Sequence, residues 1–395
     1  MTGPLDGYRI VDLTGVISGP FATMILADQG ADVIKVETPG VGDYTRQAGN
    51  RKADLSASFL NNNRNKRSIA INLKDKRGWE IFNRLVKTAD VLTQNFRPGV
   101  AERIGVGEDD VRKIAPNIIY VSISGFGEKG PFKTMPTYDP LIQALSGLAS
   151  VQGGSDEKRP RLIRTIVPDK VTALTAAQAI TAALLKRERS GVAQHVRLSM
   201  LDSVVAFLWS SDMGGQTFIG ETVSQQRAAS FIDLIYETQD GHMSVSTMTN
   251  LQWVAFTVAA EHPEWQEDER FKTPALRDLN INDRLKLIQS ALETKTTDEW
   301  MDILEPAGVP CAPVLTRKEI PDHPQIQASE ILVELEHPQA GPLRQARAAA
   351  RFDKTPPTMR RNAPLLGQHT TELMTELGYD AAEIDALRKA SVTGG

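Results

Sequence analysis

The stretch Tyr8-Arg9-Ile10-Val11-Asp12-Leu13 begins the pattern that decides the fold. It has the composition of a strand, and a turn bracketed by Gly15 and Gly19 follows it. The next segment has a helical pattern and ends at Gly30, and Ala31–Val36 is a second predicted strand. A strand, a helix and a strand in this order form a crossover unit, which predicts parallel strands.

The same alternation continues along the chain and predicts an α/β fold. A helix capped by Asp75 is expected after the third strand, and the last long helix of this region ends in a basic turn followed by Gly191. The polar stretch Thr38 to Arg67 is about thirty residues long, and a loop of that length inside a compact domain more often has a function than not. The further predicted strands are Ser68–Leu73, Asp90–Thr93, Asn117–Ser124, Gln194–Leu198 and, near the end of the chain, Ile331–Glu336.

The first crossover lacks the signature of a dinucleotide fold. Glu37 follows the second strand, where such folds keep a ribose-binding acid, but Gly15-Val16-Ile17-Ser18-Gly19-Pro20 does not match G-x-G-x-x-G. Without the middle glycine, pyrophosphate has no close approach to the backbone. The sequence therefore disfavours a nicotinamide or flavin enzyme.

A second, smaller domain is predicted in the middle of the chain. Phe231–Thr238 and Met243–Thr247 have strand patterns and flank Asp240-Gly241, a strong hairpin signal. Helical patterns follow the hairpin, so we expect a small α+β domain over residues 216–316. Residues 1–215 and 330–395 are then expected to form the large domain, and residues 317–329 a linker.

Composition excludes several classes of function. The chain has 395 residues, a net charge of −4, one cysteine and six histidines without paired spacing. This charge gives no general attraction to nucleic acid, the single Cys311 disfavours a multi-cysteine metal site, and no apolar run reaches the ~20 residues of a membrane helix. We expect a cytosolic protein with no metal. A local basic cluster of Arg64, Lys66 and Arg67 is a candidate contact for a phosphate group.

The candidate catalytic stretch is Ile166-Val167-Pro168-Asp169-Lys170-Val171-Thr172-Ala173, where an extended segment turns into a helix. Two interpretations of Asp169 are open. It is either a helix N-cap or an ionised carboxylate that acts as a nucleophile toward an activated acyl group. Elsewhere, Asn95 and Arg97 follow a predicted parallel strand, where open α/β sheets place ligands, and Asp139 begins a short helix.

These stretches together resemble the class III CoA-transferases, the family that includes formyl-CoA transferase and α-methylacyl-CoA racemase. The likeness covers nearly the whole chain, and its segments are specific because they occur in one order at matching separations. The segments are Gly19-Pro20, Leu26 to Glu37, Asn65 to Ile69, Asn95 to Gly99, Tyr138-Asp139-Pro140 with Gln143-Ala144 and Ser146-Gly147, Asp169, and Ala363 to Thr370.

The resemblance implies a Rossmann-like large domain with a parallel sheet formed by N- and C-terminal segments, and two ring-like subunits interlocked as a homodimer. It implies coenzyme A and acyl-CoA as substrates, with no permanently bound cofactor, and Asp169 as the catalytic aspartate. Lys74, Arg97 and Arg103 also suit the CoA phosphates by their charge, and Met200 is a weaker match beside the expected pantetheine path. The residues matching CoA contacts are Ile17, Ser18, Leu73, Lys74, Asn95, Phe96, Arg97, Arg103, Tyr138 and Asp139.

The resemblance implies transfer of CoA from an acyl-CoA to a free carboxylic acid through acylated Asp169. The alternative is a racemase for 2-methylacyl-CoA, but racemases of this family pair an aspartate with a histidine where Tyr138 stands here. A non-catalytic CoA-binding subunit is a third possibility, which the retained Asp169 disfavours. Formyl-CoA transferase carries a glycine run in its small domain that the stretch Leu234 to Trp253 lacks, so formyl or oxalyl substrates are not supported.

Overall fold

The computed structural model describes residues 3–53, 55–154, 156, 158–220 and 234–394. Contacts divide the chain into two units, a larger one formed by residues up to 228 with residues 330–395, and a smaller one formed by residues 229–329. The predicted hairpin strand Phe231–Thr238 lies partly outside the described residues. Residues 317–329, which we expected as a linker, carry a 3₁₀ turn (Ile320–Asp322) and helix α15 (Pro324–Ser329) and group with the smaller unit.

A seven-stranded sheet forms the centre of the larger unit, in the order β14-β5-β2-β1-β6-β7-β8. Six strands are parallel, and the short C-terminal β14 is antiparallel to β5 at one edge. The predicted parallel α/β sheet is thus confirmed. Its strands are β1 (Arg9–Asp12), β2 (Asp32–Glu37), β5 (Lys66–Ile71), β6 (Val91–Gln94), β7 (Ile119–Ser124), β8 (His195–Ser199) and β14 (Thr393–Gly394).

Alternate residues of each strand supply two apolar layers, one on each face of the sheet. Ile10 of β1 packs with helices α1 (Ser18–Asp28) and α8 (Val167–Ser190), whereas the next residue, Val11, packs with α3 (Lys76–Lys87) on the other face. Both Ile10 and Val11 are fully buried. Helices on both faces explain why the residues of the central strands are almost all buried, including polar ones such as Asp12 and Lys35.

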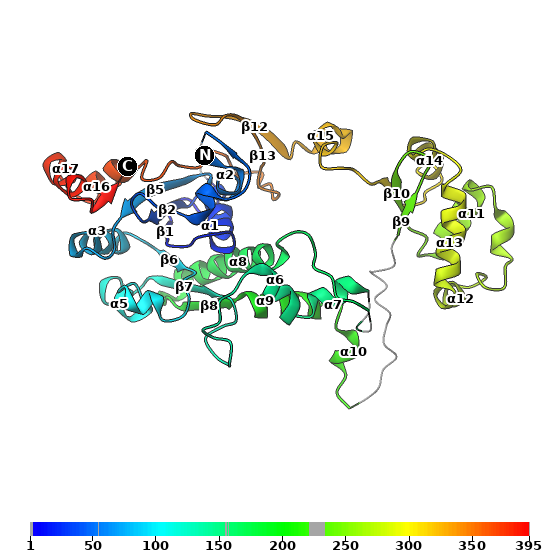
Figure 1. The fold of residues 1–395 in the computed structure, drawn as a ribbon, viewed down its shortest axis with the longest axis horizontal. Coiled ribbons are helices and arrows are strands. Elements are labelled where there is room, and N and C mark those ends of the chain that lie inside the picture. Colours follow the sequence, from blue (N-terminus) through cyan, green and yellow to red (C-terminus); the bar gives the residue numbers. More distant parts are fainter. Residues whose placement is uncertain (1–2, 54, 155, 157, 221–233, 395) are drawn as a thin grey trace. The chain divides into compact units, whose positions relative to one another are not determined.

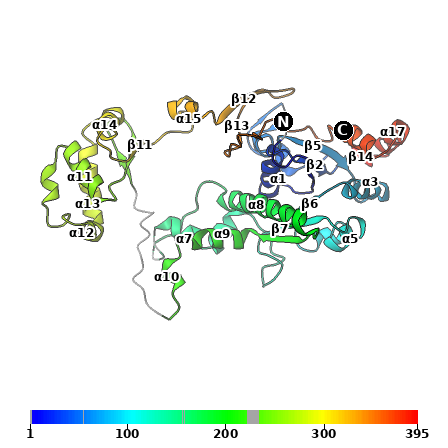
Figure 2. The same ribbon diagram turned by 180° about the vertical axis from the view of Figure 1, so that it is seen from behind.

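The C-terminal segment completes the second face. Helices α16 (Thr370–Glu376) and α17 (Ala381–Lys389) lie beside α3 (Figure 1), where the Arg84 guanidinium stacks over the Tyr379 ring. On the first face, α8 runs alongside α1, as the view from behind also shows (Figure 2). The remaining helices of the larger unit are α2 (Ala57–Asn63), α4 (Val100–Arg103), α5 (Glu108–Ile114), α6 (Asp139–Leu145), α7 (Leu148–Gly153), α9 (Met200–Trp209) and α10 (Gly214–Thr217).

Two segments contain more structure than their sequence pattern predicted. The expected loop from Thr38 to Arg67 contains a 3₁₀ turn (Tyr44–Gln47), strands β3 (Arg51–Lys52) and β4 (Leu55–Ser56), and α2. The expected strand Ile331–Glu336 is observed as β12 (Leu332–His337), and it pairs with an unpredicted strand β13 (Gly341–Ala346) as a separate hairpin. The polar composition of both segments concealed these short elements.

The smaller unit is built around a three-stranded antiparallel sheet in the order β11-β10-β9. Trp253 and Trp300 are each 1% exposed and form its apolar core with Phe256. Its elements are β9 (Ile235–Glu237), β10 (His242–Val245), α11 (Asn250–Ala259), a 3₁₀ turn (Pro263–Gln266), α12 (Pro274–Leu279), α13 (Ile281–Leu292), α14 (Thr297–Leu304) and β11 (Cys311–Pro313).

In the described part of the chain, every helix is too short or too polar to cross a membrane.

Candidate active site

Asp169 does not cap its own helix. Helix α8 begins at Val167, its N-cap residue is Ile166, and this cap makes no side-chain hydrogen bond. Asp169 therefore lies inside the first turn, and the N-cap interpretation of its carboxylate is wrong. Its side chain, which is only partly exposed, is directed instead toward the start of a neighbouring helix.

The partner of the Asp169 carboxylate is Ser18, the first residue of α1. The backbone N–H and the hydroxyl of Ser18 face this carboxylate and act to lower its pKa. The N-terminus of α1 also carries the positive end of the helix dipole, which favours a negative charge placed there. Close packing fixes the start of α1, because a Cβ at Gly19 would lie 2.3 Å from Cβ of Thr14.

A second carboxylate, Asp139 of α6, lies against Asp169. Oδ2 of Asp139 accepts a hydrogen bond of 3.5 Å from the backbone N–H of Asp169, and Oδ1 accepts one of 2.6 Å from Nε2 of Gln143. Gln143 in turn accepts a 2.9 Å hydrogen bond from the backbone N–H of Ile163, in the segment that leads into α8. Asp139 is 5% exposed, and this burial raises the pKa of its carboxyl.

The surroundings of Asp169 raise its pKa to about 6. Burial is the largest cause and the negative charge of Asp139 is the second, whereas the hydrogen bonds from Ser18 act in the opposite direction. The carboxylate is therefore ionised at neutral pH but incompletely solvated. A carboxylate in that state is suited to nucleophilic attack, because little hydration must be removed when it reacts.

A pocket of about 680 Å³ lies at the carboxyl ends of the central strands. Four of the residues predicted to bind CoA line it together, namely Leu73, Lys74, Asn95 and Phe96. The Asn95 side chain joins the loops after β1 and β6, because it donates to the Gly15 carbonyl (2.8 Å) and accepts from the Gly15 N–H (2.9 Å). The chain order reverses between these two strands, which is where open α/β sheets bind ligands.

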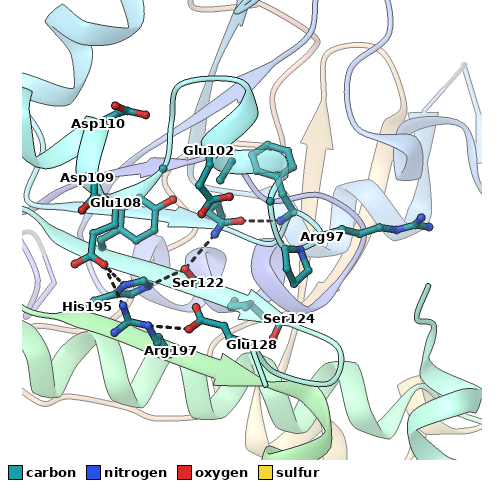
Figure 3. Close-up of a pocket in the computed structure, with 18 of the residues that line it drawn as sticks. Arg97, Glu102, Glu108, Asp109, Asp110, Ser122, Ser124, Glu128, His195 and Arg197 are labelled. Carbon is teal, nitrogen blue, oxygen red and sulfur yellow. Dashed lines mark hydrogen bonds and ion pairs between the residues drawn. The ribbon is translucent and has the colours of Figure 1, made fainter. Parts of the chain in front are cut away.

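The remaining predicted contacts lie elsewhere. Arg97 lines a different pocket (Figure 3), and Arg103 is the last residue of α4 and lines neither pocket. Tyr138 is 68% exposed at the N-cap of α6, and Ile17 is the N-cap of α1. Met200, the weaker match, is buried in an apolar cluster with α6.

The basic cluster is not a phosphate site. Arg64 pairs with Asp28 (2.6 Å), Lys66 pairs with Asp12 (3.0 Å), and Arg67 pairs with acidic residues of β2 and α16. All three cationic side chains are nearly buried, so the prediction of a phosphate contact here is wrong. Their acidic partners come from other strands and helices, so the local sequence did not reveal them.

A buried ion network under the pocket was also missed by the sequence reasoning. Nζ of Lys35 lies 3.0 Å from Asp43 and donates a 2.7 Å hydrogen bond to the Thr14 carbonyl, while Arg46 pairs with Glu37 at 2.6 Å. The signal was present in Asp-Val-Ile-Lys-Val-Glu, in which Lys35 occupies an interior position of a buried strand. In the residues that the structure describes, no group of three His, Cys, Asp or Glu side chains is arranged to hold a metal ion.

Comparisons of sequence and structure relate this chain to known proteins. The sequence pattern of the family described as CoA-transferase family III matches residues 5–370. Human succinyl-CoA:glutarate CoA-transferase is 36% identical over 397 residues, covering 98% of this chain and 90% of that protein. Acetyl-CoA:oxalate CoA-transferase of Acetobacter aceti is 38% identical over 338 residues, covering 84% and 86%. The crystal structure of a CaiB/BaiF family protein from Brucella suis superimposes with a TM-score of 0.83 at 29% identity, covering 95% and 100%.

Proposed function

The chain belongs to CoA-transferase family III, and from this premise we propose that it transfers coenzyme A from an acyl-CoA to a free carboxylic acid through a covalent intermediate on Asp169. The observation that carries the proposal is the partly buried carboxylate of Asp169, which lies beside Asp139 and the start of α1 and has its pKa raised to about 6. This arrangement supplies both a reactive carboxylate and hydrogen-bond donors for negative charge that develops beside it.

The proposed reaction begins with attack of an Asp169 oxygen on the thioester carbonyl. The carbon–sulfur bond breaks, CoA leaves as a thiolate, and a mixed anhydride forms. The thiolate then attacks the Asp169 carbonyl carbon, which releases the donor acid and leaves an aspartyl-CoA thioester. The acceptor carboxylate reverses the sequence through a second anhydride and takes the CoA. A carboxylate is required at this position because a general base alone does not activate the acceptor acid.

The pocket lined by Lys74, Asn95 and Phe96 is the proposed site for the nucleotide end of CoA. The exposed Lys74 ammonium provides a positive charge for phosphate, and Phe96 provides an aromatic face. The predicted contacts of Ile17, Arg97, Arg103, Tyr138 and Asp139 with CoA remain part of the proposal.

We propose a dicarboxylic acid as the acceptor. The relatives are named for glutarate with succinyl-CoA and for oxalate with acetyl-CoA or formyl-CoA, and both acceptors are dicarboxylates. The stretch from Leu234 to Trp253 lacks a glycine run, which favours glutarate over oxalate. A matrix of succinyl-, acetyl- and formyl-CoA against glutarate, succinate and oxalate, read by mass spectrometry of the CoA esters, identifies the pair.

An interlocked homodimer in the cytosol is also part of the proposal. Membership of the family supports the homodimer. The single cysteine, Cys311, supports a cytosolic location, because disulfide bonds are rare in the cytosol. Light scattering on the purified chain tests the dimer, since a monomer that is fully active would overturn it.

The proposed intermediate is tested by trapping. Protein incubated with the donor acyl-CoA is treated with hydroxylamine and digested, and we expect the hydroxamate on Asp169 alone. Asp169→Asn should give no adduct and no transfer, whereas the matched variant Asp202→Asn, at an exposed aspartate in the first turn of α9, should retain both. Transfer by the Asp169→Asn variant would contradict the proposal.

The racemase alternative is tested separately. Tyr138, at the position where a racemase has its histidine, is largely exposed and carries a phenol in place of the imidazole that a two-base racemase uses. We therefore expect no exchange of deuterium into the α-carbon of a 2-methylacyl-CoA in the absence of an acceptor acid.

A further inference from the structure

The second pocket of the larger unit, of about 530 Å³, lies over β6, β7 and β8 (Figure 3). Tyr120 of β7 belongs to the apolar layer that contains α3 and α5, whereas Val121 belongs to the layer that contains α8. Because side chains alternate along a strand, Ser122 and the pocket that it lines are on the α5 face. The helix that carries Asp169 covers the opposite face, so Ser122 and Asp169 lie on different faces of the sheet. The pocket adjoins the proposed CoA pocket, because Phe96 lines both.

Three side chains in this pocket form a hydrogen-bonded chain that ends on a hydroxyl. Oε2 of Glu108 lies 2.5 Å from Nδ1 of His195, and Nε2 of His195 lies 2.8 Å from Oγ of Ser122 (Figure 3). The residues come from α5, β8 and β7, which are distant in sequence. This order of carboxylate, imidazole and hydroxyl is the order of groups in serine hydrolases.

The hydrogen-bond partners fix the direction of each bond. The carboxylate of Glu108 only accepts, so Nδ1 of His195 carries the proton and Nε2 of the neutral ring accepts. Nε2 of Gln94 donates to Oγ of Ser122 at 3.1 Å, which leaves the hydroxyl proton of Ser122 directed at His195. Ser122 thus has the orientation of a nucleophile whose proton is ready for transfer to the imidazole.

Neighbouring groups hold the imidazole and the carboxylate in place. The Tyr120 ring packs edge-on against the His195 ring with 4.9 Å between centroids, and Glu108 also accepts from Arg112 (2.8 Å) and Arg197 (3.1 Å). Burial lowers the pKa of His195 below its usual value even though the charge of Glu108 acts to raise it. The ring is therefore a free base at neutral pH.

Gln94 supplies a donor for an oxyanion beside Ser122. Its Oε1 accepts a 2.8 Å hydrogen bond from the backbone N–H of Phe96, which fixes the orientation of the side-chain amide. One N–H of the amide is directed at Oγ of Ser122, and the same NH₂ group has a second N–H. A side-chain amide in this role contributes about 10²–10³ to kcat in a serine protease.

We propose that Ser122, His195 and Glu108 form a second catalytic site that hydrolyses small carboxylic esters. Oγ of Ser122 bonds to the ester carbonyl carbon while its proton moves to Nε2 of His195. The carbon–oxygen bond to the alcohol breaks, and the leaving oxygen takes that proton. Water then attacks the acylated serine with His195 as base, which releases the carboxylic acid and restores the hydroxyl.

The lining of the pocket restricts the ester to a small, polar one. Charged side chains surround the opening, and apolar surface is limited to a few residues such as Phe96 and Ile123. A long alkyl chain would therefore displace hydrated charges without gaining apolar contact. The charged side chains of the lining are Arg97, Glu102, Glu108, Asp109, Asp110, Lys113, Glu128 and Arg197.

The experiment uses the full-length protein with 4-nitrophenyl acetate as the substrate and a fluorophosphonate as the covalent probe. We expect hydrolysis above the buffer rate, and we expect peptide mass spectrometry to place the phosphonyl group on Ser122. Ser122→Ala and His195→Gln should each lower kcat/KM by about 100-fold or more. Circular dichroism and thermal unfolding of each variant verify that it is folded.

Two variants serve as matched controls. Ser124→Ala removes a hydroxyl two residues along the same strand, in the same pocket but outside the hydrogen-bonded chain, and should hydrolyse the ester within about twofold of the parent protein. Asp202→Asn, at an exposed aspartate outside both sites, should also leave hydrolysis and labelling unchanged. The position of the label, on Ser122 and not on Asp169, keeps this result independent of the transferase proposal. A phosphonyl group on any residue other than Ser122, no labelling at all, or unchanged hydrolysis by folded Ser122→Ala would overturn the inference.

Discussion

The backbone N–H of Asp169 donates a hydrogen bond to Oδ2 of Asp139, with 3.5 Å between the two atoms, so two carboxylates share one partly buried site. Burial and the charge of Asp139 raise the pKa of Asp169 to about 6. If ionised Asp169 is the nucleophile, kcat/KM for CoA transfer should be constant above neutral pH and fall tenfold per pH unit below about 6. A pH–rate profile with saturating acceptor checks this; a profile that stays flat to pH 4.5 would contradict it.

Asp139→Asn removes the negative charge of Asp139, which is the second largest cause of the raised pKa of Asp169. The largest cause, burial of Asp169, remains. We therefore expect the acidic limb of the profile to move to lower pH without reaching the pKa of a free aspartate. A purely structural effect of the substitution would lower the rate at every pH and leave the limb in place. Comparison of the two complete profiles distinguishes these outcomes.

Asp169→Asn should stabilise the protein at neutral pH. The pKa of Asp169 is about 6 in the folded state and about 3.9 when unfolded, so between these values the folded state binds more protons and stability falls as pH rises. The asparagine does not titrate. The variant should match the parent below pH 4 and exceed it above pH 6, by on the order of 1–3 kcal/mol before screening by solvent. Urea unfolding at pH 4 and pH 7.5, with Asp202→Asn as the control, measures the difference.

Lys74→Ala tests the CoA pocket. The exposed Lys74 lines the pocket at the carboxyl end of β5, and loss of its charge should raise KM for the acyl-CoA about three- to tenfold with kcat nearly unchanged. The effect should shrink at 0.5 M salt, because ions screen an exposed charge pair. Lys76→Ala, an equally exposed lysine two residues away that does not line the pocket, should leave KM unchanged. Equal changes of KM in the two variants would contradict the proposal that this pocket binds CoA.

The sequence contained enough information to predict the parallel sheet and to select Asp169 as the candidate catalytic residue. Strand and helix periodicities are local, and the strand–helix–strand order that begins at Tyr8 implies parallel strands, because the crossover helix returns the chain to the same end of the sheet. The family pattern selected Asp169, but local sequence could not show that its carboxylate contacts Ser18, about 150 residues earlier in the chain. The nearby pair Asp139 and Gln143 was within reach, because a spacing of four residues places both on one helix face.

Long-range ion pairs could not be predicted either, because their partners are far apart in the sequence. A run such as Arg64-Asn65-Lys66-Arg67 has the composition of an exposed anion site, and only the fold reveals that Asp28, Asp12 and Asp32 neutralise it. The charge pattern of this run therefore predicted an exposed phosphate contact, whereas the three cations form buried ion pairs with acidic residues far away in the sequence. Apolar patterns were more reliable because burial depends on the residue itself.

The pair of Asp12 and Lys66 should be essential for stability. Both side chains are 0% exposed, their charged atoms are 3.0 Å apart, and Asp12 also accepts hydrogen bonds from Thr14 and Thr23. Asp12→Asn leaves the buried ammonium without its counter-charge and should cost about 3–5 kcal/mol. Replacing both residues, as Asp12→Asn with Lys66→Met, should cost less than the sum of the single changes. Urea unfolding of the four proteins measures the coupling, and additive effects would show that the pair does not interact.

Gly19→Ala should damage the transferase site through packing alone. A Cβ at Gly19 would lie 2.3–2.5 Å from three side-chain atoms of Thr14, and Thr14 cannot yield easily because its N–H and hydroxyl both bond to Asp12. The start of α1 must therefore move, and with it the N–H and hydroxyl of Ser18 that act to lower the pKa of Asp169.

We expect a loss of about 1–3 kcal/mol in unfolding free energy and a drop in transfer rate of more than tenfold at pH 8. Gly241→Ala provides the control, since its nearest atom would be 3.4 Å away, and should change neither quantity. The pH–rate profile separates a change at the site from general weakening of the fold. With fewer hydrogen bonds to the carboxylate, the pKa of Asp169 should rise and the acidic limb should move to higher pH, opposite to its movement in Asp139→Asn. A Gly19→Ala protein that is less stable but has an unshifted limb would show that the start of α1 does not control the charge of Asp169.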